Sequence, residues 1–202
     1  DSNEQNPFFN YIEEGIYNVS LKVTTEFDTQ EVVKEGYITV TSPNNVSGKI
    51  YGVWHTDKSP YRVTGDVLIP EDGSLFIEPG VEVITDNSEI RVEGQIIANA
   101  IDKEQIVFTS DSSWKGIKIS YSKKENTLNN VLFTKATDTA LCLDYSPTTI
   151  IGSTFYKNSG NVGAGGLQVN GTNDIVFKNN IFSNNQSNKG CAAVEANASS
   201  FS

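Results

Sequence analysis

The side chains that could carry chemistry in this chain are mainly carboxylates. Glycoside hydrolysis needs two or three of them facing one groove, and a calcium-dependent lyase needs several around one cation, with an arginine or lysine nearby. Eight lie after residue 100: Asp102, Glu104, Asp111, Glu125, Asp138, Asp144, Asp174 and Glu195. Their spacing is irregular, so it does not by itself predict a catalytic set, and we expect them to be solvated surface charges.

Three tyrosines offer a different chemistry, because an aromatic ring can stack on the apolar face of a sugar. Tyr121, Tyr145 and Tyr156 each fall just after a short apolar segment, where a ring can face solvent. We take these three as the candidate ligand-binding residues, for carbohydrate stacking. Packing within the turns is the alternative explanation of the same rings.

Metal and nucleophile chemistry has little support in the sequence. His55 is the single histidine and has no cysteine near it, so a zinc ligand set is missing. Cys142 and Cys191 are predicted to be free thiols, Cys142 partly exposed. A weakly bound calcium is the one cofactor considered, at residues 71–73 or 111–113, although neither has an ordered ligand spacing. We predict no catalytic residue and no metal site.

The charge balance argues against two partner classes. The chain has 15 basic and 25 acidic residues, for a net charge of −10. Nucleic-acid binding depends on clustered cations that release counterions, so we expect no nucleic-acid partner. An apolar run near 18 residues is missing from the sequence, so we also expect no membrane span.

Two columns of short apolar strands must position these side chains. Phe108, Phe133, Phe155 and Phe182 recur at steps of 25, 22 and 27 residues. A second column runs through residues 117–119, 141–143, 167–169 and 194–196. Repeats of this length cannot bury their apolar faces alone, so they predict a stack of coils with very little helix.

Aligning the coils places the charged residues relative to one another. Lys118 falls in the same outward column as Cys142, Gln168 and Glu195, and the counterpart of Asp144 in the next coil is Asn170. On this alignment, carboxylates do not stack on neighbouring coils beside a cation. The alignment therefore favours a non-catalytic surface over an active site within this sequence.

Asparagines mark the turns of the stack. Asn158 and Asn185 hold equivalent places after their phenylalanines, as Asn130 and Asn180 do before theirs. Asparagine can adopt left-handed turn conformations and hydrogen-bond along a stack, so we predict a structural ladder. Residues 159–166 lengthen one coil into a projecting loop.

The last coil starts at Val194 without a polar cap. An uncapped stack exposes strand edges and apolar core. We expect the natural protein to continue beyond Ser202, or another chain to cover this end.

Residues 8–41 have a different pattern. Alternation of apolar and polar residues predicts strands at 16–24, 31–35 and 36–41, with a hairpin turn across 26–29. The run 14–23, with Gly15, Tyr17, Val19, Leu21 and Val23, resembles the second half of a PKD-type immunoglobulin-like domain. The resemblance implies a partial β-sandwich in residues 1–42 and an extracellular spacer or interaction role.

The rest of the chain resembles secreted right-handed parallel β-helix proteins of the pectate-lyase-like type. The resemblance rests on residues 59–70, 75–83, 90–94, 106–110 and 114–117, and on the later repeats 179–185 and 190–194. It implies an all-β fold in which a linker, residues 43–48, leads into a right-handed parallel β-helix (solenoid) over residues 49–202. These motifs specify an architecture rather than a reaction.

The favoured function is a non-catalytic one in a secreted or cell-surface bacterial-type modular protein: adhesion, polysaccharide binding or a structural stalk. Its expected partners are a polysaccharide or another cell-surface protein. One alternative is a polysaccharide lyase or glycoside hydrolase whose catalytic coils lie outside this sequence. Another is a secreted cargo or partner subunit of a larger surface assembly.

Overall fold

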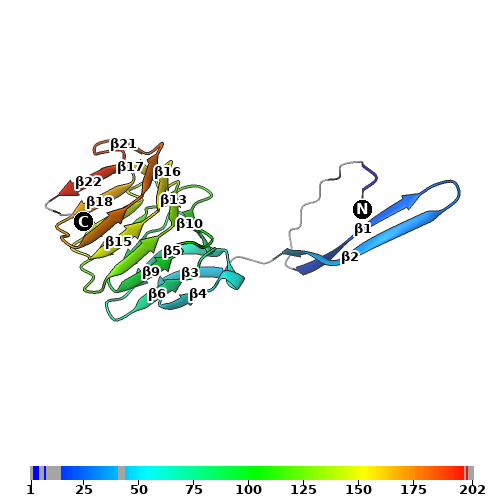
Figure 1. Ribbon diagram of the computed structural model, residues 1–202, viewed down its shortest axis with the longest axis horizontal. Helices are drawn as coiled ribbons and strands as arrows, with labels where there is room; N and C mark the ends of the chain where they lie inside the picture. The colour runs from blue at the N-terminus through cyan, green and yellow to red at the C-terminus, as the bar shows by residue number, and fades with distance from the viewer. Residues whose placement is uncertain (1, 5–6, 8–14, 41–43, 198, 200–202) are drawn as a thin grey trace. The chain divides into compact units, whose positions relative to one another are not determined.

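The computed structural model describes residues 2–4, 7, 15–40, 44–197 and 199. Its contacts divide the chain into two compact units, Asp1–Ser42 and Pro43–Ser202 (Figure 1).

The first unit contains an antiparallel hairpin of β1 (Gly15–Thr24) and β2 (Thr29–Val40). The hairpin turn lies where the sequence predicts it, but the two strands expected at 31–35 and 36–41 are one continuous strand. Gly36 adopts a φ of +59° opposite an irregularity in β1, and its N–H donates to Asn18 Oδ1 at 2.7 Å. The glycine therefore marks a bulge within a strand rather than a turn between two. The expected lead-in at residues 8–14 lies outside the described residues.

The second unit begins one strand earlier than predicted. Residues 44–48, expected as part of a linker, lie in β3 (Asn44–Lys49), which pairs in parallel with β5 (Tyr61–Ile69). Most of β3 is exposed, and Val46 is the side chain that packs on the core. Pairing to the long strand β5 thus overrides the turn propensity of this segment.

From β4 onward the second unit is a stack of three-sided coils, in which each strand pairs in parallel with its counterpart one coil away (Figure 1). The first side contains β4 (Gly52–Trp54), β6 (Ser74–Ile77), β9 (Gln95–Asn99), β12 (Asn126–Asn129), β15 (Thr148–Ile151) and β19 (Ile175–Lys178). The second side contains the first half of β5, β7 (Glu82–Thr85), β10 (Ile106–Thr109), β13 (Val131–Thr134), β16 (Thr154–Tyr156) and β20 (Ile181–Ser183).

The third side contains the second half of β5, β8 (Ile90–Val92), β11 (Ile117–Ser120), β14 (Leu141–Asp144), β18 (Leu167–Asn170) and β22 (Val194–Asn197). The predicted insertion, residues 159–166, contributes β17 (Ser159–Gly160), which pairs with β21 (Gln186–Ser187). The one helix in the described residues is a short 3-10 turn, η1 (Thr56–Lys58). The low helix content predicted from the sequence is therefore confirmed for this part of the chain.

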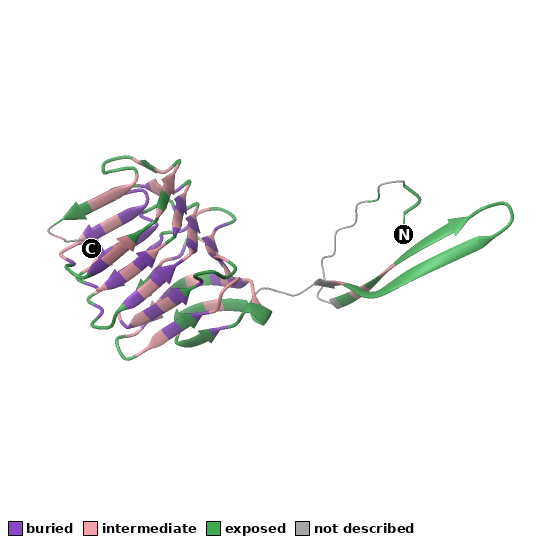
Figure 2. Ribbon diagram, viewed as in Figure 1, coloured by how far each residue is buried: buried purple, intermediate pink, exposed green. Residues whose placement is uncertain are grey.

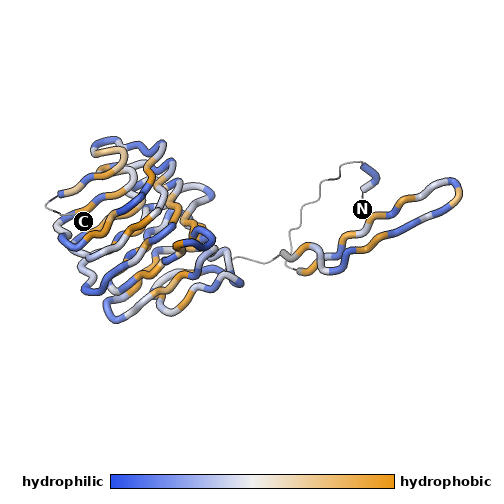
Figure 3. The backbone as a smooth tube through the Cα atoms, viewed as in Figure 1, coloured by the Kyte–Doolittle hydropathy of each residue, from blue (hydrophilic) through white to orange (hydrophobic). Residues whose placement is uncertain are grey.

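The core is a file of like side chains inside the coils. Phe108, Phe133, Phe155 and Phe182 pair in register, with successive ring centroids 5.7, 4.8 and 4.5 Å apart. Buried and outward residues alternate along most strands, which gives the bands of Figure 2 and the alternating hydropathy of Figure 3. Both predicted columns are confirmed.

The asparagine ladder is present, with one difference from the prediction. Asn158 Nδ2 donates to the carbonyl of Phe133 at 3.0 Å, and Asn185 Nδ2 repeats this contact with Phe155 at 2.9 Å. Asn158 and Asn185 are not themselves in the left-handed region. The residues before them are, Lys157 at φ +55° and Asn184 at φ +56°. At these two positions the left-handed residue makes the turn, and the following asparagine hydrogen-bonds into the neighbouring coils. Asn130, in contrast, is itself left-handed, at φ +51°, as predicted.

A close approach of backbones fixes the turn before β11. Trp114 is fully buried, stacks on Phe108 and donates its indole N–H to the carbonyl of Thr134 at 2.9 Å. Gly116 has a φ of +87°, and a Cβ there would lie 1.9 Å from the carbonyl oxygen of Thr139. Glycine is therefore required at this position.

Candidate functional site

A set of outward polar groups lies on the third side of the coils, which we call the outer face. Two columns of side chains cross it in register. The first contains Arg91, Lys118, Cys142, Gln168 and Glu195, and the second contains Ser120, Asp144, Asn170 and Asn197. Strands of one sheet lie about 4.8 Å apart, so neighbours in a column can touch.

Asp144 is the hub of this face. One carboxylate oxygen, Oδ2, accepts from Lys118 Nζ at 3.2 Å and Ser120 Oγ at 3.4 Å, and the other, Oδ1, accepts from Asn170 Nδ2 at 2.7 Å. Asn197 Nδ2 in turn donates to Asn170 Oδ1 at 3.1 Å. The result is a directional ladder in which each amide donates towards the carboxylate.

The protonation of these groups follows from their contacts. Burial alone would raise the pKa of Asp144, but the hydrogen bond from Asn170 and the charge of Lys118 lower it. Burial likewise opposes the charge on Lys118, yet Asp144 raises the pKa of this lysine. Burial and the nearby Asp144 carboxylate raise the pKa of the Cys142 thiol to about 12. Asp144 is therefore a poor general acid, Lys118 a poor general base and Cys142 a poor nucleophile.

A hollow of about 410 Å³ lies over the first column. Val162 and Gly163, from the long coil insertion, form part of its wall, and Lys118, Cys142, Gln168 and Glu195 lie along it. A Cβ at Gly163 would lie 1.9 Å from Gln168 Oε1, so the insertion passes directly against the Gln168 amide. The insertion thus turns one edge of a flat sheet face into a groove.

Two tyrosines lie at the end of the same strands. The rings of Tyr121 and Tyr145 stack, with centroids 5.4 Å apart and planes 10° from parallel, and their residues are 69 % and 58 % exposed. Both residues are left-handed, at φ +53° and +48°, as is Gly171 at the same corner of the next coil. A Cβ on Gly171 would lie 2.3 Å from Tyr145 Cε1, so the Tyr145 ring covers this glycine.

The third predicted residue, Tyr156, does not join them. It lies on β16, on the second side of the coils, in register with Thr134 and Ser183. Its ring is half-buried and lies 5.0 Å from the Lys157 ammonium. The structure therefore brings together two of the three candidate tyrosines. Their joint position could have been found from the sequence, since both follow the second column and Tyr156 follows the first.

The Lys118–Asp144 ion pair is a contact of this face that the sequence alignment missed. These residues occupy different columns and meet diagonally between β11 and β14. Such diagonal neighbours are within reach of a long side chain such as lysine. Comparing residues only within a column hides this contact.

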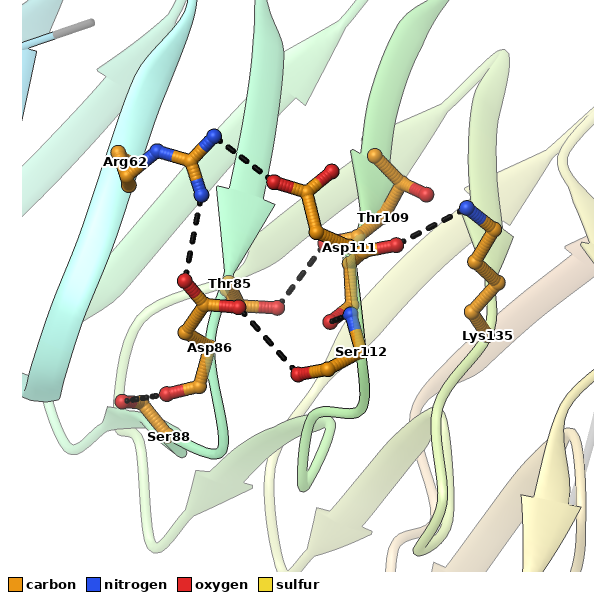
Figure 4. A network of polar contacts seen from close by, with 9 residues as sticks. Arg62, Thr85, Asp86, Ser88, Thr109, Asp111, Ser112 and Lys135 are labelled. Atoms are coloured by element: carbon orange, nitrogen blue, oxygen red, sulfur yellow. Dashed lines mark hydrogen bonds and ion pairs between the residues drawn. The ribbon is translucent and has the colours of Figure 1, made fainter.

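A second polar cluster surrounds Arg62 on the second side (Figure 4). The guanidinium contacts Asp86 Oδ2 at 3.2 Å and Asp111 Oδ2 at 2.8 Å, and Lys135 Nζ donates to the carbonyl of Ser110 at 3.0 Å. The hydrogen bond that Arg62 donates to Asp111, followed by the charges of both carboxylates, raises the pKa of Arg62. Arg62 pairs with carboxylates that follow two successive strands of this side, so the cluster joins neighbouring coils.

The positions considered for calcium are also occupied by protein cations. Asp111 pairs with Arg62, and Glu71 pairs with Lys123 Nζ at 2.5 Å. His55 lies at a surface turn, with Nδ1 3.1 Å from Glu78 Oε1. Among the described residues, no group of three His, Cys, Asp or Glu side chains is placed to hold a metal ion.

The described part of the chain contains no helix that is both long and apolar enough to cross a membrane. Cys142 and Cys191 are free, as predicted, the first half-buried and the second exposed.

Comparison with known proteins adds one finding. No curated protein and no solved structure matches the chain. The family model for the right handed beta helix region matches residues 75–202, which run from within β6 to beyond β22 and contain the whole of the groove and the tyrosine pair. With the parallel coils seen in the structure, this match shows that the chain belongs to the right-handed β-helix family.

Proposed function

We propose that the outer face binds carbohydrate, without catalysis, and that the protein is a secreted or cell-surface adhesion or binding module. The observation that carries this proposal is the exposed, parallel pair of Tyr121 and Tyr145, which directly follow the two strands, β11 and β14, whose Lys118 and Cys142 line the polar groove. Sugar sites in proteins combine an aromatic surface with a few polar groups that fix orientation.

The protonation states on the outer face support binding over catalysis. Asp144 is held ionised and Lys118 protonated by their contact, and the Cys142 thiol is held neutral. Each of these groups is thus suited to hydrogen bonding and poorly suited to proton transfer or attack.

The finer family assignments belong to this proposal. A pectate-lyase-like relationship and a PKD-like first unit both agree with an extracellular polysaccharide-binding role. The hairpin β1–β2 supports the second, since it carries the alternating apolar residues on which the resemblance rests.

The test is a glycan array probed with the full chain and with the double variant Tyr121→Gly/Tyr145→Gly. Glycine suits the left-handed backbone at both positions, so the variant removes the rings without straining the turn. We expect affinity to fall at least tenfold, equivalent to about 1.4 kcal/mol. Tyr51→Ala is the matched control, because Tyr51 is 71 % exposed and lies outside the outer face.

Equal binding by the double variant and the wild type would refute the proposal. Incubation of the bound glycans with the protein, with and without calcium, provides the second readout. Release of shorter or unsaturated products would favour the enzyme alternative instead.

A further inference from the structure

Resting on the proposed function, we infer the chemical class of the ligand: a glycan that offers hydroxyl donors and carries no carboxylate. We further infer that Glu195 accepts a hydrogen bond from one of its hydroxyl groups.

Glu195 has an unused acceptor on the groove. Its Oε2 atom is buried and has no hydrogen-bond partner among the described residues. The other oxygen, Oε1, accepts from Asn197 Nδ2 at 3.4 Å. Leaving a buried carboxylate oxygen without a hydrogen bond is unfavourable, because the lost hydration is not replaced. A ligand hydroxyl that reaches this oxygen replaces that hydration.

The neighbour of Glu195 in the column supplies complementary chemistry. Gln168 pairs in register with Glu195, and its side-chain amide has no hydrogen-bond partner within the described part of the chain. An amide both donates and accepts, as a hydroxyl does. Together the two side chains present an acceptor and a donor–acceptor pair to a polyhydroxyl ligand.

The charges around the groove disfavour an acidic glycan. Glu89, Asp138 and Glu195 line the hollow with two ammonium groups, from Lys115 and Lys118. Lys118 is already paired with Asp144. A uronate would therefore meet one ammonium without a carboxylate partner and an excess of carboxylates. Placing like charges together across a desolvated interface costs several kcal/mol.

The two halves of the site lie close enough for one oligosaccharide. Tyr145 follows Asp144 at the end of β14, three residues after Cys142 on the groove floor. Three residues of extended chain span about 10 Å. A ligand stacked on the tyrosines can thus reach the groove.

The experiment measures binding of two oligosaccharide series by calorimetry, each with calcium and with a chelator. The neutral series contains gluco-, galacto-, manno- and xylo-oligosaccharides, and the acidic series contains oligogalacturonate and oligoguluronate. We expect binding in the neutral series and at least tenfold weaker binding throughout the acidic series, in both conditions. For Glu195→Gln we expect the affinity for the neutral oligosaccharides to fall at least fivefold. We also expect the ratio of neutral to acidic oligosaccharide affinities to become smaller.

Glu82→Gln is the matched control, since Glu82 also lies half-buried on a strand but on the second side of the coils. Tighter binding of uronates than of neutral glycans, or a Glu195→Gln affinity equal to that of the control, would overturn the inference.

These failures are separable from failure of the proposed function. Uronate binding that Tyr145→Gly abolishes would overturn this inference and leave the proposed function standing. Binding of neither series, or binding that Tyr145→Gly leaves unchanged, would overturn both.

Discussion

Replacing Phe155 with alanine tests whether the file of aromatic rings stabilises the coils. Phe155 is fully buried and stacks on two neighbours, Phe133 at 4.8 Å and Phe182 at 4.5 Å. Truncating a buried phenylalanine costs about 3–5 kcal/mol through lost burial and the cavity left behind. Each aromatic pair adds about 0.5–1.5 kcal/mol beyond its buried area. With two pairs lost, we expect the upper part of that range, about 4–5 kcal/mol.

The matched control is Phe76→Ala on β6, where the side chain is 44 % exposed and points outward. There we expect a loss below about 1.5 kcal/mol, since little apolar area leaves water at that site. The assay is urea unfolding followed by circular dichroism. Hydrogen exchange adds a coil-by-coil readout, because coils of a solenoid can open separately. Equal losses for the two variants, or intact exchange protection in β13 and β16 of Phe155→Ala, would refute the reasoning.

Three further predictions concern the turns and the outer face. Gly116→Ala should lower the free energy of unfolding by more than about 2 kcal/mol, because its Cβ would overlap a carbonyl oxygen of the next coil. Gly152 is also left-handed but faces open space, so Gly152→Ala should lower the free energy of unfolding by only about 1 kcal/mol in the same urea titration. Equal losses for the two glycine variants would contradict the overlap at Gly116. The pKa of Asp144 is lower in the folded than in the unfolded chain. The stabilisation that ionised Asp144 contributes to the free energy of unfolding should therefore be fully present above the unfolded pKa of about 4, and it should be lost as the pH falls through the folded pKa. Asp144→Asn should remove that part of the pH dependence, and an unchanged acid titration would count against the ion pair. At pH 8 a thiol reagent should modify the exposed Cys191 well before Cys142, because burial raises the pKa of the Cys142 thiol to about 12. Mass spectrometry gives the order of modification, and the reverse order would contradict the burial of Cys142.

The repeat was predictable because burial in a stack of coils requires apolar residues at regular spacings in the sequence. Each inward position must match the one above it, so the phenylalanine spacing specified the partners of Phe133 and Phe155 correctly. The same alignment correctly paired Cys142 with Gln168 on the outer face.

Features that depend on contacts across the repeat were harder to predict. The segment 44–48 contains turn-forming residues, and only its pairing with β5 makes it a strand. The Lys118–Asp144 contact is diagonal, and a column-by-column alignment does not represent diagonals. The wall of the groove comes from Val162 and Gly163 in an insertion, and a repeat does not predict where an insertion folds.

Tyr121 and Tyr145 together make up the sugar-binding surface that we propose. NMR of the chain with carbon-13-labelled tyrosine rings observes this surface directly, since each of the eight tyrosines gives its own ring signals. With a saturating neutral oligosaccharide that the calorimetry identifies, we predict shifts in the Tyr121 and Tyr145 signals and unchanged signals from Tyr51 and Tyr156. Shifts at other tyrosines, with these two unchanged, would contradict the account.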